Sequence, residues 1–167
     1  MTRTVATALP DFEVVAALPS FFDQEVPEEY VDMNGHMNIT HYFSLGAWGP
    51  WKRMAELGMP EDYMTTGSSF FTASHHLTYL SELRQGERFA IHAAFADRTD
   101  KAVHSVALVA DHTNRRVACV MEITHVHVSL ETRRASSIPA WLAEPLDGEI
   151  ATTPWVAAVA TGLSLRG

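Results

Sequence analysis

The sequence predicts an α+β fold in which an antiparallel β-sheet wraps around one long central α-helix. Between residues 39 and 57, apolar and small residues recur at spacings of three and four, the periodicity of a helix with one buried side. After residue 67 the period changes, and four long segments rich in β-branched and aromatic residues follow with short breaks between them. One domain is expected, because 167 residues suffice for one core but not for two ordinary ones.

The segment before the helix is expected to be less regular. Residues 1–19 are interpreted as a loosely attached N-terminal arm. Residues 20–31 are predicted to form a strand that carries Pro27 near its end, where an edge or a bulge tolerates proline. A short polar segment then leads into the helix.

The helix over 39–57 contains a proline. Gly49 and Pro50 lie inside its periodic pattern, and proline removes a backbone donor and clashes with the preceding turn. We therefore expect one bent helix rather than a straight one. Gly58 and Pro60 are expected to end it.

Four strands are expected after the helix, forming an antiparallel meander. They span residues 68–83, 87–99, 102–113 and 116–131, separated by the turn-like breaks RQG, DK and NR. Several strands carry apolar residues at positions that face opposite sides of the sheet, as Val106 and Val109 do. Both faces of the sheet must therefore be partly covered. Since one helix covers one face only, we predict a homodimer or homotetramer in which a second sheet covers the other face. Residues 145–167 show no clear periodicity and are interpreted as a C-terminal tail, mobile or exchanged between copies.

Composition argues against several classes of protein. The 47% hydrophobic and 19% charged residues fit a soluble globular protein, and no window is apolar over the roughly 18 residues of a membrane span. A formal net charge of −8 argues against nucleic acid as a partner. Pro10, Asp11 and Glu13 interrupt the apolar run that a secretory signal needs, so a cytoplasmic location is expected. Cys119 is the one cysteine and is interpreted as core, so neither a disulfide nor redox chemistry is indicated, and no cofactor is expected.

Residues 30–42, YVDMNGHMNITHY, gather acidic, amide, imidazole and phenol groups around one glycine, directly before the helix. This segment resembles the Asp-x-x-Gly-His-x-Asn-Asn-x-x-Tyr signature of hotdog acyl-CoA thioesterases of the hydroxybenzoyl-CoA thioesterase type. The matching positions are Asp32, Gly35, His36, Asn38 and Tyr42. Ile39 stands where a second asparagine is usual, which puts a substrate contact from that position in doubt. The resemblance covers about residues 20–140 and includes HHLTYLSELRQGERFAIHAAF, which is similar to the second and third strands of that family.

The resemblance implies a hotdog thioesterase domain over residues 20–144 that hydrolyses a small acyl-CoA thioester to the free acid and CoA. A narrower likeness, in DKAVH, MEITHVHV and the NGHMN core, is to the hotdog thioesterases associated with carnitine breakdown, which act on betainyl-CoA. A trimethylammonium acyl group favours an aromatic surround. The helix offers Tyr42, Phe43, Trp48 and Trp51 for this contact, although core packing also explains each of them taken alone. His41 and Tyr42 complete the candidate substrate-binding set with the two tryptophans, and packing explains these two adequately as well.

Thioester hydrolysis needs a nucleophile or general base near the carbonyl carbon and donors aimed at the carbonyl oxygen. Asp32 lies seven residues before the expected helix with Gly35 between, so the chain can hold this carboxylate near the helix N-terminus, which favours negative charge. Asp32 is thus expected to activate water or to attack directly, with an oxyanion hole formed by backbone near residues 35–38. Asn38 could orient the water or thioester, and His36 could position the loop or protonate the leaving thiolate. The alternative for Asp32 is a helix N-cap or an Asx-turn.

Two other functions remain open at this point. His75 and His76, with His125 and His127, suggest a metal site, because residues two apart on a strand face the same side. Adjacent His75 and His76 should point to opposite faces, however, and no acid completes a compact cluster, so no metal ligand is assigned. A non-catalytic acyl-CoA or small-ligand binding module on the same fold is the other alternative, and the acid at position 32 favours an enzyme.

The phosphates of CoA need cationic partners. In the resembling family the nucleotide portion lies on the surface near a subunit interface. Six arginines are candidates, and the sequence does not choose among Arg84, Arg88, Arg115, Arg116, Arg133 and Arg134.

Overall fold

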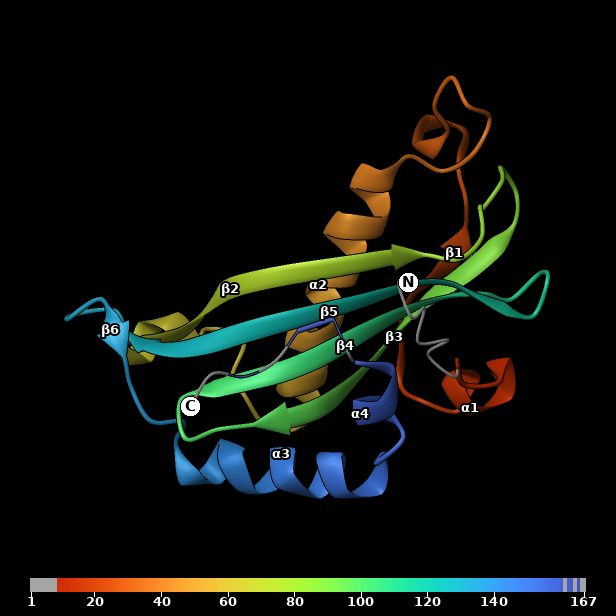
Figure 1. The fold of residues 1–167 in the computed structure, drawn as a ribbon. Coiled ribbons are helices and arrows are strands. Elements are labelled where there is room, and N and C mark those ends of the chain that lie inside the picture. The colour runs from red at the N-terminus through yellow and green to blue at the C-terminus, as the bar shows by residue number, and fades with distance from the viewer. Residues whose placement is uncertain (1–8, 161, 164, 166–167) are drawn as a thin grey trace, which may run out of the picture.

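The computed structural model describes residues 9–160, 162–163 and 165, and it contains the predicted antiparallel sheet and long helix (Figure 1). The strand order is β1-β3-β4-β5-β2, and a short β6 pairs with β5. The strands are β1 (Ser20–Glu25), β2 (Ser68–Tyr79), β3 (Arg88–Arg98), β4 (Ala102–Asp111), β5 (Arg116–Ser129) and β6 (Arg134–Ala135). The helices are α1 (Phe12–Ala16), α2 (Ile39–Glu56), α3 (Ala140–Thr152) and α4 (Val156–Val159), with 3-10 turns at Glu28–Tyr30 and Tyr63–Thr66.

The long helix α2 lies across one face of the sheet, and its small residues permit a close approach. A Cβ atom on Gly49 would lie 2.9 Å from Cγ2 of Ile91 on β3, and one on Gly46 would lie 2.5 Å from Cε of Met121 on β5. Pro50 is inside this one continuous helix, as the sequence predicts. The main core therefore lies between α2 and the centre of the sheet.

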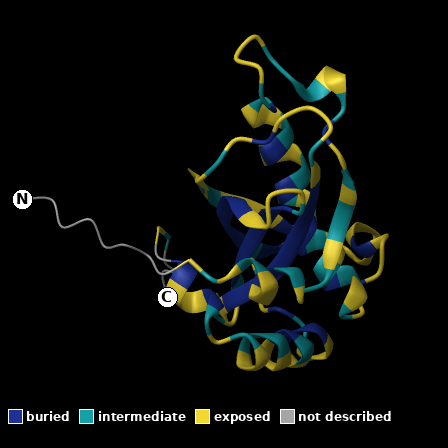
Figure 2. Cartoon of the chain, turned by 90° about the vertical axis from the view of Figure 1, so that its right-hand side faces the viewer, coloured by how far each residue is buried: buried dark blue, intermediate teal, exposed yellow. Residues whose placement is uncertain are grey.

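On the opposite face of the sheet, the structure differs from the sequence interpretation, which placed a second copy of the protein there. Val15 of α1 and Val156 of α4 are fully buried and belong to one apolar cluster with Val106 and Leu108 of β4. Figure 2 shows the central strands as buried and the outer sides of the flanking helices as exposed. The chain itself therefore covers much of the face that the sequence argument assigned to a second copy.

The described parts of the predicted arm and tail are more regular than the sequence indicates. Residues 1–8 of the expected arm lie outside the described residues, but the rest of the arm contains α1. The expected tail begins inside α3, whose Leu146 is fully buried. The apolar periodicity of the sequence does not predict these helices, because α1 and α4 span only five and four residues, and α3 carries Pro145 in its interior.

Strand ends also differ from the predicted ones. β1 ends at Glu25, and the residues after Pro27 form a 3-10 turn instead of continuing the strand. β2 ends at Tyr79 rather than at residue 83, because the next two N–H groups both donate to the carbonyl of Ala118. Among the described helices, none combines the length and apolarity that a membrane crossing needs.

Candidate active site

The polar segment before α2 folds into a tight loop. Val31 and Met37 form an isolated antiparallel bridge, and inside it the N–H of Asp32 donates to the carbonyl of His36 at 3.2 Å. The N–H of Gly35 donates to the carbonyl of Asp32 at 2.9 Å. Gly35 has φ of +80°, a left-handed conformation that glycine adopts without strain, so its place in the turn follows from backbone geometry.

The carboxylate of Asp32 is held by two donors. The backbone N–H of Asn34 donates to Oδ1 and the side-chain amide of Asn38 donates to Oδ2, each at 2.8 Å. The Asn34 N–H and then the Asn38 amide lower the pKa of the partly exposed Asp32, so this group stays ionised at neutral pH. Asn38, not Asp32, is the N-cap of α2, since its Oδ1 accepts from the N–H of Thr40 at 3.0 Å.

The structure places Asp32 near the helix N-terminus as predicted. It also reduces the number of backbone N–H groups that are available for the expected oxyanion hole. Between residues 35 and 38, the N–H groups of Gly35, Met37 and Asn38 already donate to carbonyls of this chain. Those of His36 and Ile39 have no acceptor among the described residues. One N–H group in the loop and one at the first residue of α2 are thus left to stabilise a developing negative charge.

A pocket of about 310 Å³ adjoins this loop. It is lined by His36, Met37, Ile39, Tyr42, Tyr79, Leu80, Ser81 and Glu82. The sequence analysis missed the last four as site residues. They reach the loop through a tertiary contact, in which the N–H of Met37 donates to the carbonyl of Leu83 at 2.8 Å. No sequence motif predicts this contact, because the two segments are far apart in the chain.

His41 and Tyr42, both predicted to bind substrate, help to hold the loop. The ring of His41 stacks on Tyr30 with centroids 3.8 Å apart. The hydroxyl of Tyr42 accepts the N–H of Leu83 at 3.1 Å, and burial raises the pKa of Tyr42 to about 12. Tyr42 also lines the 310 Å³ pocket, so it can contact a ligand through its ring.

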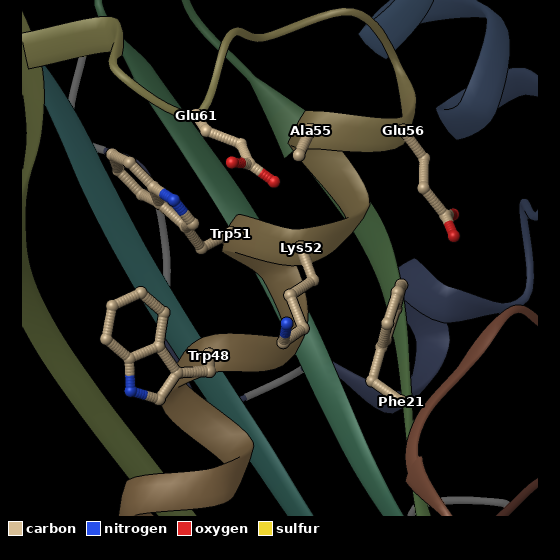
Figure 3. A pocket seen from close by; sticks show the side chains of 7 residues that line it. All are labelled: Phe21, Trp48, Trp51, Lys52, Ala55, Glu56 and Glu61. Atoms are coloured by element: carbon tan, nitrogen blue, oxygen red, sulfur yellow. The ribbon is translucent and has the colours of Figure 1, made fainter.

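Trp48 and Trp51, the other two predicted contacts, lie elsewhere on α2. They line a separate pocket of about 380 Å³ with Phe21, Lys52, Ala55, Glu56 and Glu61. Figure 3 shows Lys52 between the tryptophans and Phe21. Trp48 follows Asn38 by ten residues, about 15 Å along a helix. The structure therefore does not bring these tryptophans together with Asp32 of the same chain.

His75 and His76 have different neighbours, as expected for adjacent strand positions. His75 lies beside Phe43 of α2, whereas His76 contacts the carboxylate of Glu122 through Nδ1 at 2.9 Å. His125 bonds to Ser105, and burial lowers its pKa to about 4. Within the described part of the chain, no group of three or more His, Cys, Asp or Glu residues is placed to hold a metal ion.

The six candidate arginines fall into two groups. Four are paired with carboxylates, as Arg84–Glu82, Arg88–Asp23, Arg115–Glu13 and Arg116–Asp111. Arg133 and Arg134 have no carboxylate partner among the described residues, and the guanidinium of Arg133 lies 4.9 Å above the ring of Phe71. These two are therefore the arginines most available to an external phosphate.

Comparisons with known proteins give consistent results. Residues 26–146 match the model of the Thioesterase-like superfamily. An L-carnitine dehydrogenase/betainyl-CoA thioesterase of Ruegeria pomeroyi is 29% identical over 129 residues, 76% of this chain but 26% of that protein. A betainyl-CoA thioesterase of Pseudomonas aeruginosa is 25% identical over 130 residues, 77% of each chain. This chain thus spans about a quarter of the length of the first relative and most of the second.

Solved structures show the same fold. A Staphylococcus aureus protein in complex with CoA aligns with a TM-score of 0.76 at 21% identity, covering 89% of this chain and 97% of that one. A Thermus thermophilus thioesterase complexed with coenzyme A and Zn aligns with a TM-score of 0.67 at 18% identity, covering 80% and 96%. The fold is the hotdog fold, as the sequence predicts.

Proposed function

The chain belongs to the Thioesterase-like superfamily, and from this premise we propose that it hydrolyses a small acyl-CoA thioester to the free acid and CoA. One observation carries the proposal: the ionised carboxylate of Asp32 is held in a loop that leaves two N–H groups without an acceptor among the described residues, and His36 and Met37 of this loop line a pocket. A thioesterase needs these three elements. The betainyl-CoA thioesterases among the relatives support betainyl-CoA as the substrate.

In the proposed mechanism, the carboxylate of Asp32 acts either as a general base or as the nucleophile. It either takes a proton from a water molecule that attacks the thioester carbon, or attacks that carbon itself and is then released by water. The N–H groups of His36 and Ile39 stabilise the carbonyl oxygen as it gains charge. Asn38 fixes the carboxylate in place. His36, as the imidazolium, gives its proton to the leaving thiolate, and a proton of the water consumed in hydrolysis replaces it.

Release of free thiol from a panel of acyl-CoAs tests the proposed activity. The panel contains betainyl-CoA, short linear acyl-CoAs and an aromatic acyl-CoA, each measured with and without a chelator. Chelator-insensitive hydrolysis that is greatest with betainyl-CoA is expected. A different preferred acyl group would keep the thioesterase and reject the substrate. No hydrolysis of any member would favour a non-catalytic binding module, and loss of activity with chelator would favour a metal-dependent enzyme.

We also propose that two copies pair through β2. This strand lies at the edge of the sheet, spans 12 residues and pairs only with β5 within the described chain. The strand exposes Phe71, and an unpaired edge with an apolar side chain is a template for a second strand. Light scattering coupled to gel filtration tests this proposal. The expected mass is at least twice the 18.5 kDa of one chain, and a monomer would contradict it.

Pairing of this kind would explain how Arg133 and Arg134 reach a CoA molecule. Both lie near the Ser68 end of β2, whereas Asp32 lies near the Tyr79 end, about 36 Å away along a 12-residue strand. An antiparallel partner strand would place the arginines of one copy beside Asp32 of the other. Arg134→Ala should raise KM about tenfold with little change in kcat, because it removes a charge-assisted contact to phosphate. An unchanged KM would reject this assignment, and Arg88→Ala, whose guanidinium already pairs with Asp23, is the matched control.

A further inference from the structure

We propose that the 310 Å³ pocket beside the catalytic loop recognises the positive charge of a quaternary ammonium acyl group, through the ring of Tyr79 and the carboxylate of Glu82. This inference rests on the proposed thioester hydrolysis and names the residues that select the acyl group at the same site. It differs in part from the sequence expectation, in which Tyr42, Phe43, Trp48 and Trp51 of the helix surround the cation, because only Tyr42 of these lines the pocket.

The size of the acyl group decides between the two pockets. In a betainyl group one methylene separates the carbonyl carbon from the quaternary nitrogen, so these two atoms lie about 2.5 Å apart, as N and C do in an amino acid. The cation must therefore bind next to the group that acts on the thioester. Trp48 lies about 15 Å along α2 from Asn38, too far to contact that cation while Asp32 of the same chain attacks the ester. The pocket that includes His36 adjoins the loop directly.

The aromatic wall of this pocket is preorganised. Tyr42 and Tyr79 are perpendicular, at 87°, with ring centroids 5.4 Å apart. The hydroxyl of Tyr42 is fixed by the N–H of Leu83, and its ring is buried, so it supports Tyr79 from one side. Tyr79 is 46% exposed and offers its ring to a ligand. A cation within about 6 Å of such a ring is attracted by the negative charge on its face.

The charged wall is Glu82. Its Oε1 accepts both donors of Arg84, at 2.8 and 2.5 Å, and its Oε2 has no donor among the described residues. Arg84 lowers the pKa of Glu82, so the carboxylate stays ionised, and Arg84 itself does not line the pocket. A second cation can therefore approach the free oxygen. Met37, Ile39 and Leu80 complete the lining with apolar surface that suits three methyl groups.

Two substrates of equal shape differ in the charge of the acyl group. The ammonium group also makes the thioester carbon more electrophilic, so recognition is read from the change in the substrate ratio between variants. Betainyl-CoA and 3,3-dimethylbutanoyl-CoA differ only in the exchange of the quaternary nitrogen for carbon. For the unmodified protein, kcat/KM should favour betainyl-CoA by at least about tenfold, the size of a desolvated cation–π contact. Because both substrates are measured on the same preparation, a loss of folded protein cancels in the ratio.

Variants then locate the selecting residues. Tyr79→Leu and Glu82→Gln should each bring the ratio several-fold closer to one, and Tyr79→Phe should keep it, since the ring remains. Trp141→Leu removes an exposed aromatic residue on α3 and should leave the ratio unchanged.

Three outcomes would overturn the inference. Equal hydrolysis of the two substrates by the unmodified protein would reject charge recognition while leaving thioester hydrolysis intact. A ratio lowered by Trp48→Leu but not by Tyr79→Leu would assign the cation to the other pocket. Failure to hydrolyse either substrate, or any other acyl-CoA, would reject the proposed function together with the inference.

Discussion

At the scale of single residues, Asn38 connects the fold to the proposed chemistry. Its Oδ1 caps α2 through the N–H of Thr40, and its Nδ2 donates to Asp32. The residue that starts the helix therefore also orients the carboxylate. The sequence analysis gave an N-cap or an Asx-turn as the alternative role of Asp32 and assigned Asn38 to water or thioester. In the structure Asp32 Oδ1 makes the Asx-turn bond to the N–H of Asn34, and Asn38 is the N-cap.

Substitution of Asn38 should separate these two effects. The ionised form of Asp32 is the active one, so activity is present above its pKa and lost as the pH falls through it. Asn38 is one of the donors that lower this pKa, and Asn38→Ala should therefore move the acid limb of the kcat/KM profile to higher pH. The same variant should lose about 1 kcal/mol of unfolding free energy with the cap.

Asn38→Ser is the matched control. Serine caps helices well but has no amide to donate to Asp32, so stability should recover while the shifted acid limb remains. An acid limb that stays in place in Asn38→Ala would show that Asp32 does not set it.

At the scale of elements, the contact of α2 with the sheet depends on two glycines with different neighbours. A Cβ on Gly46 meets the flexible end of Met121, which can move aside. A Cβ on Gly49 meets Cγ2 of Ile91, which is β-branched and buried in β3. Gly49→Ala should therefore lower the unfolding free energy by about 1–3 kcal/mol, as overpacking does. Gly46→Ala should be nearly neutral, and equal urea midpoints for the two variants would contradict this account of the packing.

The elements that the sequence predicts well are those with long periodic patterns. The structure confirms α2 and the four long strands to within a few residues at most of their ends. The missed elements are the short helices α1 and α4 and the Pro145-containing α3, because four or five residues give too few repeats for a period. The predicted strand through Pro27 failed for a local reason, since the chain turns there.

At the scale of the whole molecule, sequence predicts one part of the candidate site and not the other. Asp32, Gly35, His36 and Asn38 come together as predicted because they lie within seven residues. The pocket beside them also needs Tyr79 and Glu82, which are far from the loop in sequence. The fold of the sheet brings these residues to the loop, and the spacing of residues within the loop does not predict this. The length of α2 separates the tryptophans from the loop, since Trp48 lies about 15 Å along the helix from Asn38. The cytoplasmic location stays a prediction.

The helices after β6 are part of the folded unit rather than a loose tail. Leu142 of α3 is fully buried against Phe95 and Val103, and Arg53 of α2 donates to Glu149 of α3 at 3.0 Å. Leu142→Ala should lower the unfolding free energy by about 2–5 kcal/mol through the cavity it leaves. Chemical denaturation checks this value against Glu144→Ala, an exposed position on the same helix. A loss of unfolding free energy below about 0.5 kcal/mol, as is typical of surface sites, would show that the segment is a loose tail after all.

The central claim is that the carboxylate of Asp32 drives thioester hydrolysis, as general base or as nucleophile. The most direct test is thiol release from betainyl-CoA by Asp32→Asn, with circular dichroism and light scattering to confirm the fold and the oligomeric state of the variant. Asparagine keeps the shape of the side chain but can neither take a proton from water nor attack. We expect an intact protein whose kcat is lower by at least about 100-fold. Near-full activity of a folded Asp32→Asn protein would contradict the mechanism.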